Sequence, residues 1–479
     1  MKEVYLIIDI GTGNVRVAMS DINLKILGVE TDNVHYEKDA NYPSALYFDP
    51  DYLWGQIETL TKKLITTNPY LTIRAITVSS QREGVVLMNS SGDSLIGLPN
   101  HDHRGREWEN TINDKDLVYQ LAGRYPTSLF PALKIIGIKK RRPELFSKFS
   151  KLLSISDWAQ YKLSGIYGYE HSQASETLLY DIQAKNWSSE LCSIFGINKT
   201  ILPKLYNSGE VLGKILPSCA TSLNISNETV IIVGGSDTQL AIKSTTPAPE
   251  DIIIVSGTTT PIVKIMTSYM IDPKQRTWTN RHIDSDHFVL ETNAGVTGLN
   301  YQNSKRLFYT NESYNQIEQE MSSITNPQCL SFLGSLIAGE KEPMSKGGFI
   351  FEVPVSQQLS RASFMWAILF EIACSIKENF EILQSVSKYQ KDYIWICGGG
   401  FQSPLLRQLI ASLLNKKLRI RKGYSQASVI GAAIICNESL NPQRTNETEF
   451  DEIDPNNQDH YMKMFEDWKK NRKELKKIF

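Results

Sequence analysis

The sequence predicts an α/β protein of two domains, and three observations lead to this fold class. The chain has 479 residues, about twice the length at which a single hydrophobic core usually stops growing. A strand–turn–strand pattern opens the chain at residues 4–20 and returns at residues 252–266. Apolar residues at helical spacing follow in the second half. The turn-rich stretch 241–250 indicates the boundary, which gives predicted domains of residues 1–243 and 244–479.

The first predicted domain begins with three apolar runs, at residues 4–8, 15–20 and 25–29. A glycine-rich turn at residues 11–14 and a second turn at residues 21–23 separate these runs, which is typical of an antiparallel meander. Further short apolar runs predict three more strands, at residues 75–79, 84–88 and 229–233.

The second predicted domain repeats this opening, with apolar runs at residues 252–256 and 262–266 on either side of a glycine and threonine turn. Residues 362–386 contain neither glycine nor proline and carry apolar residues at helical spacing, so they predict a long buried helix. A strand at residues 393–397 runs into three consecutive glycines, and an amphipathic helix begins at about Ser403.

The composition is that of an ordinary globular protein, with 41% hydrophobic and 22% charged residues. A formal net charge of -1 provides no basic surface for a phosphate backbone, so we expect no nucleic-acid partner. No apolar run approaches the roughly 20 residues of a membrane helix, and the first strand is unlike a cleavable signal. Six cysteines without paired spacing indicate buried, reduced thiols. We therefore expect a cytoplasmic protein that acts on small molecules, with no membrane partner.

The C-terminal stretch, residues 461–479, carries aromatic and aliphatic residues at roughly helical spacing with lysines between them. A basic amphipathic helix of this kind could bind a membrane surface. The alternative is a closing helix that packs on its own domain and leaves a solvated lysine face, which is the commoner arrangement. We expect the packed helix.

Two glycine and threonine turns predict a phosphate-binding site. Transfer of a γ-phosphoryl group requires amides or hydroxyls around the phosphates, a magnesium ion, and a carboxylate that accepts a proton. The chain contains no G-x-x-x-x-G-K-[ST] run, but hairpin turns at residues 11–14 and 257–260 could face each other across a cleft. Asp9 ends the strand before the first turn, where a carboxylate would reach a magnesium ion. One turn alone also fits an ordinary hairpin with a capping aspartate, whereas the second turn favours the phosphate site.

Short motifs follow one another along nearly the whole chain, at residues 9–16, 80–84, 100–104, 156–158, 164–165, 172–177, 234–239, 256–259, 339–343 and 398–403. Together they resemble the FGGY family of carbohydrate kinases, which includes xylulokinase, glycerol kinase, gluconate kinase and autoinducer-2 kinase. The resemblance implies two ribonuclease-H-like domains of the actin-like ATPase fold with an interdomain cleft. It also implies ATP and Mg²⁺ as cofactors and a small sugar or polyol as substrate. A homodimer is an assembly that it leaves open.

The resemblance further implies roles for individual residues. Asp237 is the implied catalytic base, with Mg²⁺ held near Asp9 and Asp237. The implied substrate-binding residues are Arg82, Glu83, Asp102 and Arg104. The implied ATP and phosphate contacts come from the two turns and the glycine triplet, namely Gly11, Thr12, Gly13, Asn14, Arg16, Gly257, Thr258, Thr259, Gly398, Gly399, Gly400 and Ser403.

The same residues also have a direct physical interpretation. Asp237 follows two glycines at the end of a buried strand, so its carboxylate could project into the cleft, or it could cap the next helix. Arg82 and Glu83 offer donors beside an acceptor for vicinal hydroxyls, or they form a surface ion pair. The glycines at residues 398–400 would let the backbone approach a flat base, although glycine also suits a strand-to-helix turn.

Two positions depart from the family pattern on the sugar side. Gly137 and Asn100 stand where the family usually has tryptophan. The segment at residues 81–87 resembles autoinducer-2 kinase more than xylulokinase. We therefore expect a substrate similar to those of xylulokinase or autoinducer-2 kinase, and the sequence does not identify the individual sugar.

These observations predict ATP-dependent phosphorylation of a hydroxyl group of a small sugar, polyol or related metabolite. Two alternatives use the same fold: a non-enzymatic sensor of a sugar or nucleotide, and an actin-like ATPase. A sensor need not keep Asp9 and Asp237 together, yet both are present. The predicted substrate-binding residues have no evident use in an ATPase that drives motion or assembly. These residues are Arg82, Glu83, Asp102 and Arg104.

Overall fold

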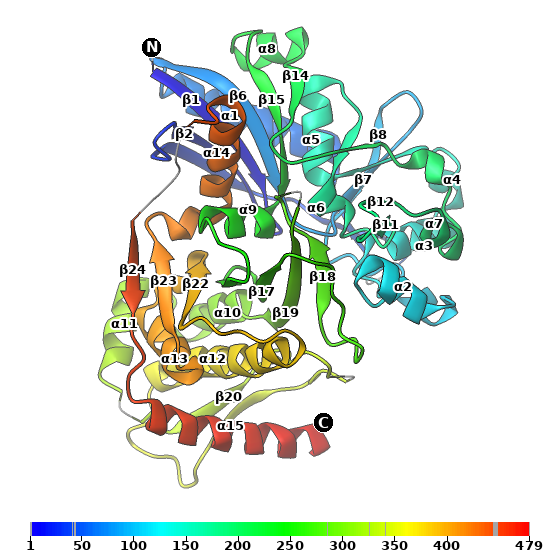
Figure 1. Cartoon of the computed structure of the whole chain (residues 1–479). Coiled ribbons are helices and arrows are strands. Elements are labelled where there is room, and N and C mark those ends of the chain that lie inside the picture. Colours follow the sequence, from blue (N-terminus) through cyan, green and yellow to red (C-terminus); the bar gives the residue numbers. More distant parts are fainter. Residues whose placement is uncertain are drawn as a thin grey trace.

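A computed structural model describes residues 2–40, 42, 45–284, 286–324, 326–340, 342–443 and 449–478. It contains two α/β domains, which lie one above the other in Figure 1, with helices α9 (Asp237–Ser244) and α14 (Ala427–Leu440) between their sheets. Two residues of the segments named above lie outside the described residues: Lys341 of the motif at residues 339–343 and Phe479 of the C-terminal stretch.

The first domain is organised around a six-stranded sheet in the order β14-β15-β6-β1-β2-β3. Strands β1 (Lys2–Ile10), β2 (Asn14–Asp21) and β3 (Ile26–Asn33) form the predicted antiparallel meander. On the other side of β1, strands β6 (Leu71–Ser80) and β15 (Val230–Ser236) run parallel to it. Strand β14 (Val211–Lys214) closes the edge in the antiparallel direction.

Helices cover this sheet and a small lobe extends from it. Helix α1 (Pro50–Thr66) packs on β2 and β3, and α5 (Ile155–Ser164) packs on β6 and β15. Each of these helices begins at a residue whose side chain accepts backbone N–H bonds, Asp49 for α1 and Ser154 for α5. The lobe contains a three-stranded sheet of β7 (Val85–Met88), β8 (Ser94–Leu98) and β9 (Lys151–Ser154), and its helices include α2 (Lys115–Ala122) and α3 (Pro131–Arg141).

The second domain repeats the strand connections of the first. Its seven-stranded sheet follows the order β18-β19-β17-β16-β22-β23-β24. An antiparallel run of β16, β17 and β19 corresponds to β1, β2 and β3, and the parallel strands β16, β22 and β23 correspond to β1, β6 and β15. The bounds are β16 (Ile252–Val255), β17 (Thr259–Met266), β18 (Trp278–Arg281), β19 (Phe288–Val296), β22 (Tyr393–Cys397), β23 (Lys417–Arg421) and β24 (Phe450–Ile453). This duplicated topology is the ribonuclease-H-like pair that the resemblance implied.

The helices expected in the second domain are present. The predicted long helix is α12 (Arg361–Val386), and the helix after the glycine triplet is α13 (Pro404–Leu414), with Ser403 as its N-cap. The closing helix is α15 (Gln458–Ile478), whose Phe465 and Trp468 are buried. The indole N–H of Trp468 donates to the carbonyl oxygen of Ser331 at 3.2 Å. The prediction of a packed closing helix is therefore confirmed.

None of the helices within the described ranges is long and apolar enough to span a membrane. All six cysteines are free thiols, as the sequence indicated, and five of them are buried. The expectation of burial fails for Cys219, which is half-buried at the end of the first domain beside helix α5, where its thiol donates to the carbonyl oxygen of Lys162.

Helix α14 belongs to the second half of the sequence but packs on the sheet of the first domain. Its residues Val429 and Ala432 lie in one buried cluster with Tyr5 and Ile7 of β1. It also crosses α9, the helix that begins at Asp237. The chain therefore enters the second domain after α9, returns to the first sheet with α14, and goes back to the second sheet with β24 (Phe450–Ile453).

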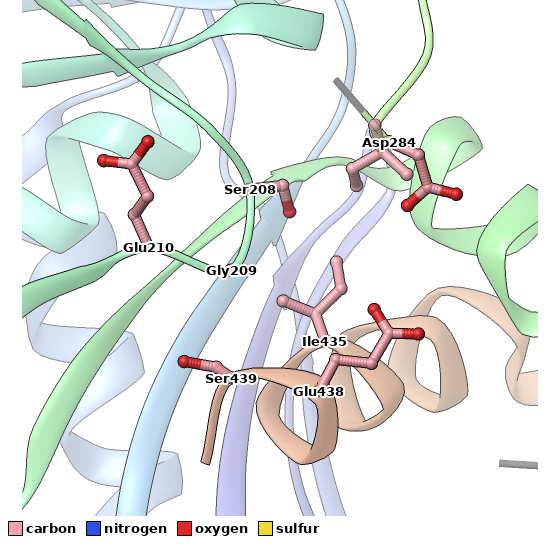
Figure 2. A pocket seen from close by; sticks show the side chains of 8 residues that line it. Ser208, Gly209, Glu210, Asp284, Ile435, Glu438 and Ser439 are labelled. Carbon is pink, nitrogen blue, oxygen red and sulfur yellow. The ribbon is translucent and has the colours of Figure 1, made fainter. Parts of the chain in front are cut away.

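A pocket marks the junction on one side of these helices (Figure 2). Its lining residues are Ser208, Gly209, Glu210, Ile283, Asp284, Ile435, Glu438 and Ser439. Lys243 in the last turn of α9 pairs with Asp284 at 2.8 Å and with Glu438 at 2.9 Å. These ion pairs attach the end of α9 to both neighbouring segments and so fix the direction of the helix that starts at Asp237.

The crossing of α9 and α14 yields a stability prediction. A Cβ atom added at Gly431 of α14 would lie 1.8 Å from the carbonyl oxygen of Leu240 in α9. Gly431→Ala must push the helices apart, so we expect a loss of roughly 1–3 kcal/mol in the free energy of unfolding, measured by chemical denaturation.

Gly55→Ala is the matched control, because Gly55 is an exposed helix residue with no atom within 4 Å of an added Cβ. This substitution should be neutral or should stabilise the protein by up to about 1 kcal/mol. Equal effects of the two substitutions would contradict the tight crossing.

Candidate functional site

Three parallel strands end at one edge of the first sheet. Ser80 of β6 pairs with Ile10 of β1 and with Ser236 of β15. Because these strands run in the same direction, the residues that follow them leave the sheet at the same edge, with Gly11 and Asp237 on either side of the end of β6. Ligands of open α/β sheets bind at this carboxyl edge. The backbone register alone therefore brings the first turn close to the proposed base.

Asp237 is the first residue of α9, directly after the N-cap residue Ser236. Its carboxylate accepts a bond from the N–H of Thr238 at 2.6 Å and remains half-buried. Burial, followed by the negative charge of Asp9, raises the pKa of Asp237 to about 7, while Arg82 acts in the opposite direction. A carboxylate with a pKa near neutrality can accept a proton at physiological pH.

Asp9 lies at the end of β1 with only 2% of its surface exposed. One carboxylate oxygen, Oδ2, accepts from Arg16 at 2.6 Å and from the hydroxyl of Ser428 at 2.8 Å. The other oxygen, Oδ1, is buried and has no hydrogen-bond partner among the described residues. A buried carboxylate oxygen without a partner is costly, and a divalent cation would satisfy it. The donor set at Asp9 therefore fits a magnesium ion.

The first turn, residues 11–14, is held by hydrogen bonds at Gly11 and Thr12 and is exposed at Gly13 and Asn14. The N–H of Gly11 donates to the carbonyl oxygen of Asn14 at 2.9 Å, which closes the turn. The amide of Asn100 donates to the hydroxyl of Thr12 at 2.9 Å. Gly13 and Asn14 are exposed, and no atom lies within 4 Å of a Cβ added at Gly13. The open side of this turn has room for a phosphate group.

The second turn and the glycine triplet form one unit. Val255 of β16 pairs with Cys397 of β22, so the segments that follow these parallel strands leave the second sheet side by side. The N–H of Gly400 donates to the carbonyl oxygen of Ser256 at 3.2 Å. A Cβ added at Gly398, where φ is +104°, would lie 2.3 Å from that same oxygen. Glycine is therefore required at position 398 because the triplet packs against the second turn, a reason that was not apparent from the sequence.

Hydrogen bonds fix the second turn at Gly257 and the start of α13 at Ser403. The N–H of Gly257 donates to the carbonyl oxygen of Thr259 at 3.0 Å, and Gly257 and Thr258 are exposed. Gly399 is exposed as well. The hydroxyl of Ser403 accepts from the N–H of Leu406, so this side chain caps α13. The exposed backbone at the second turn and at Gly399 is the part that remains available to a ligand.

Residues 424–428, which lead into α14 and form its first turn, join the two halves of the site. The carbonyl oxygen of Tyr424 accepts from the N–H of Gly398 at 2.8 Å. Two residues later, the side-chain oxygen of Gln426 accepts from Arg16 at 2.7 Å. Ser428 then binds Asp9. Gln426 and Ser428 could not be predicted from the sequence, because no motif marks them and only the fold brings this segment to the first turn.

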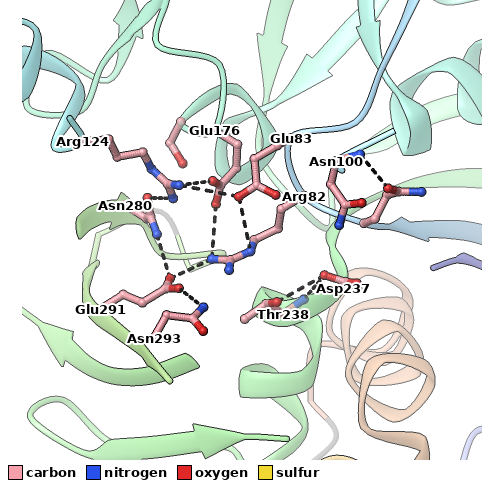
Figure 3. Close-up of polar contacts among 12 residues, drawn as sticks. Arg82, Glu83, Asn100, Arg124, Glu176, Asp237, Thr238, Asn280, Glu291 and Asn293 are labelled. Atoms are coloured by element: carbon pink, nitrogen blue, oxygen red, sulfur yellow. Dashed lines mark hydrogen bonds and ion pairs between the residues drawn. The ribbon is translucent and has the colours of Figure 1, made fainter. Parts of the chain in front are cut away.

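Arg82 and Glu83 lie in a buried cluster of charged side chains (Figure 3). Arg82 Nη1 lies 2.7 Å from Glu291 Oε2 and 3.8 Å from Glu176 Oε1, and Arg82 Nε lies 3.8 Å from Glu83 Oε1. Arg124 Nη1 lies 2.5 Å from Glu176 Oε2. The surface ion pair considered for Arg82 and Glu83 is therefore wrong, because burial and three partners replace a solvated contact.

Arg124, Glu176 and Glu291 were not among the site residues predicted from the sequence. Arg124 and Glu291 are single charged residues without a local motif, and Glu176 lies in the motif at residues 172–177, which indicated no separate role for it. All three are buried, with at most 1% of the surface exposed. What marks these three residues as part of the site is that each is buried beside a side chain of opposite charge. Only the tertiary structure shows this.

Asp102 and Arg104 form a separate buried pair. Arg104 Nε lies 2.7 Å from Asp102 Oδ2. The other carboxylate oxygen of Asp102 accepts from the N–H of Leu46, and Arg104 donates to the carbonyl oxygen of that residue. These two side chains contact each other and the segment before α1, and no described hydrogen bond or ion pair joins them to Arg82 or Glu83.

Lys134 supports the segment that carries Glu83. Its buried ammonium donates to the carbonyl oxygens of Glu83 at 2.8 Å, Pro99 at 2.6 Å and Asn100 at 3.1 Å. Glu83 has a left-handed backbone, with φ at +57°. One turn after Lys134, a Cβ added at Gly137 would lie 2.5 Å from the carbonyl oxygen of Arg104, so tryptophan cannot stand there.

Comparisons with known proteins agree with this architecture. The N-terminal domain model of the FGGY family of carbohydrate kinases matches residues 4–243, and the C-terminal domain model of that family matches residues 253–439. The protein "Putative sugar kinase YoaC" of Bacillus subtilis is 46% identical over 471 residues, covering 98% of this chain and 96% of that protein.

More distant similarities extend over the same length. An autoinducer-2 kinase of Salmonella paratyphi A is 24% identical, over 89% of this chain and 84% of that protein. A xylulose kinase structure from Lactobacillus acidophilus matches with a TM-score of 0.85 at 19% identity, covering 99% of this chain and 98% of that one. The two family models together account for most of the sequence. The chain therefore belongs to the FGGY family of carbohydrate kinases.

Proposed function

We propose that this carbohydrate kinase transfers the γ-phosphoryl group of ATP to a hydroxyl of a small sugar, polyol or related hydroxylated metabolite, with Asp237 as the general base. The observation that supports the proposal most strongly is the proximity of Asp237 to Asp9 at the sheet edge from which the first glycine–threonine turn also emerges. A base beside a second carboxylate and an open phosphate turn is the set that phosphoryl transfer to an alcohol requires.

The acceptor would bind to the first domain and the nucleotide to the second. Arg82 and Glu83 supply donors and an acceptor for hydroxyl groups. Thr12, Thr258 and the amides of both turns would hold the phosphates, and the glycine triplet at residues 398–400 would face the adenosine. Asp237 would accept the proton of the attacking hydroxyl, and closure of the two domains would exclude water.

Asp9, with Asp237 near it, would hold the magnesium ion. The free oxygen Asp9 Oδ1 points to this role, because it is buried without a hydrogen-bond partner among the residues described. Magnesium supplies positive charge that offsets the charge on the phosphates. Arg16 and Ser428 orient the Asp9 carboxylate from its other side.

The substrate class is the finer part of the proposal. The similarity to an autoinducer-2 kinase and the fold shared with a xylulose kinase favour acceptors of these kinds. Asp102 and Arg104 stay candidates for contact with such an acceptor, and their hydrogen bonds connect them to each other, to Asp39 and to Leu46.

The first test measures ADP release with and without a panel of pentuloses, polyols, aldonates and autoinducer-2 precursors. We expect release to be slow with ATP and Mg²⁺ alone and to rise at least tenfold with one class of acceptor. Rapid release without any acceptor would support the actin-like ATPase. Binding of an acceptor without any ADP release would support the sensor.

Asp237→Asn tests the proposed base directly. The substitution preserves the shape of the side chain and removes its ability to accept a proton, so we expect turnover to fall about 10²–10⁴-fold while ATP binding, measured by calorimetry, persists. Asp93→Asn is a control of the same chemistry in an exposed turn and should be silent. Near-normal turnover of Asp237→Asn would exclude Asp237 as the base.

The raised pKa of Asp237 predicts a pH dependence. Below about pH 7 the carboxyl group is increasingly protonated and cannot accept the proton of the acceptor. The value of kcat/KM should therefore rise with pH and level off above about 7. Saturating Mg²⁺ should shift this rise to lower pH, because a cation offsets the charge of Asp9. A flat profile down to pH 5 would be inconsistent with the assignment.

A further inference from the structure

The buried charge cluster contains a residue of the second domain that faces the proposed acceptor site. Arg82, Glu83, Arg124 and Glu176 come from the first domain, and Glu291 lies on β19 of the second. The side-chain amides of Asn280 and Asn293 donate to Glu291 from the same domain. Figure 3 shows these side chains converging beside Asp237.

Both guanidinium groups of this cluster already have carboxylate partners. Arg82 Nη1 lies 2.7 Å from Glu291 Oε2, and Arg124 Nη1 lies 2.5 Å from Glu176 Oε2. Glu83 lies between them, 3.8 Å from Arg82 and 3.7 Å from Arg124. All five side chains are at least nine-tenths buried, so solvent and salt screen these charges weakly.

The balance of charge therefore leaves no unmatched cation for an anionic ligand among these residues. Burial, opposed by Arg124 and Arg82 and then reinforced by the charges of Glu83 and Glu291, raises the pKa of Glu176 to about 8. Even with Glu176 protonated, Glu83 and Glu291 equal the two guanidinium groups in number. Asp237 and Asp9 add further negative charge beside them.

The neighbouring cations are engaged as well. The ammonium of Lys134 donates to three backbone carbonyl oxygens, and Arg16 is held by Asp9 and Gln426. A substrate carboxylate or phosphate would have to displace Glu291 or Glu176, which would leave a buried carboxylate without its partner. Hydroxyl groups avoid this problem, because they accept from Arg82 and donate to Glu83 or Glu291 without adding charge.

We infer that the acceptor is an uncharged polyhydroxylated molecule and that Glu291, through its ion pair with Arg82, is the second-domain residue that excludes carboxylated and phosphorylated analogues. The inference rests on the proposed kinase function and deepens it. Membership of the family does not decide this point, because a carbohydrate kinase can act on a neutral sugar or on a sugar acid. Glu291 is a specificity-determining residue rather than a catalytic one.

The test compares acceptors in matched pairs that differ in the charge of one terminal group: xylitol with xylonate, glucitol with gluconate, and glycerol with glycerate. Each compound is assayed for ADP release and for the shift in melting temperature of the full-length protein. We expect the neutral member of a pair to produce the larger effect in both assays. A larger effect of the acid member would overturn the inference, and so would the absence of any shift with all neutral members.

The two assays separate the inference from the proposed function. If neutral members raise the melting temperature and no compound releases ADP, the kinase proposal fails while the charge preference stands. If acid members alone release ADP, the protein is a kinase and the charge inference is wrong.

Glu291→Gln tests the residue itself. In this variant position 291 is neutral. When Glu176 is protonated, the two guanidinium groups then face a single negative charge, that of Glu83. The ratio of the effect of the acid member to that of the neutral member should rise about tenfold or more. Glu452→Gln is the matched control, because Glu452 pairs with Arg419 at 2.8 Å on the far edge of the second sheet, and its ratio should equal that of the wild type.

Asn293→Asp provides a second variant with the opposite sign. It adds a carboxylate beside Glu291 and preserves the oxygen that accepts from the N–H of Gly295. Discrimination against the acid members should increase in this variant. An unchanged ratio in both Glu291→Gln and Asn293→Asp, with melting temperatures near that of the wild type, would remove Glu291 from the specificity role.

Discussion

The close approach of two carboxylates, Asp9 and Asp237, is the constraint on which the rest of the site depends. Parallel pairing of β1, β6 and β15 brings both to one edge of the first sheet. Like charges in a poorly solvated place repel each other unless a proton or a cation offsets them. The raised pKa of Asp237 expresses that repulsion together with burial. In the proposed reaction, a magnesium ion that accompanies the nucleotide would bring positive charge to this pair, and the open turns would leave room for the phosphates.

The second constraint is that each part of the proposed reaction draws on both domains. Residues 424–428, which lead into α14 and form its first turn, contact Asp9 of the first domain and the glycine triplet of the second. Glu291 of the second domain holds Arg82 of the first. The relative position of the domains therefore governs the phosphate site and the acceptor site together. Helices α9 and α14 cross too closely at Gly431 to slide freely, so any closure is expected to pivot about this crossing.

Local patterns in the sequence were sufficient for most strands, for the long helix α12 and for both turns, because periodicity and glycine position act over a few residues. The packing of α14 on the first sheet could not be predicted, since its apolar residues fit either domain. Asp9 and Asp237 were identifiable from their places at strand ends. Arg124 and Glu291 were not, because a lone charge carries no signal until the fold buries it beside its partner, and the motif at residues 172–177 did not single out Glu176. The Asp102 and Arg104 pair resembled a substrate motif; it contacts Asp39 and Leu46, and its role in substrate binding stays a prediction.

A crystal structure of the protein with Mg²⁺ and a non-hydrolysable ATP analogue tests the central claim most directly. The account predicts electron density for the terminal phosphate between the turns at residues 11–14 and 257–259. It also predicts a metal ion whose coordination sphere includes Asp9, directly or through water, with the Asp237 carboxylate facing the terminal phosphate. Phosphates bound away from both turns, or a metal ion remote from Asp9 and Asp237, would contradict it.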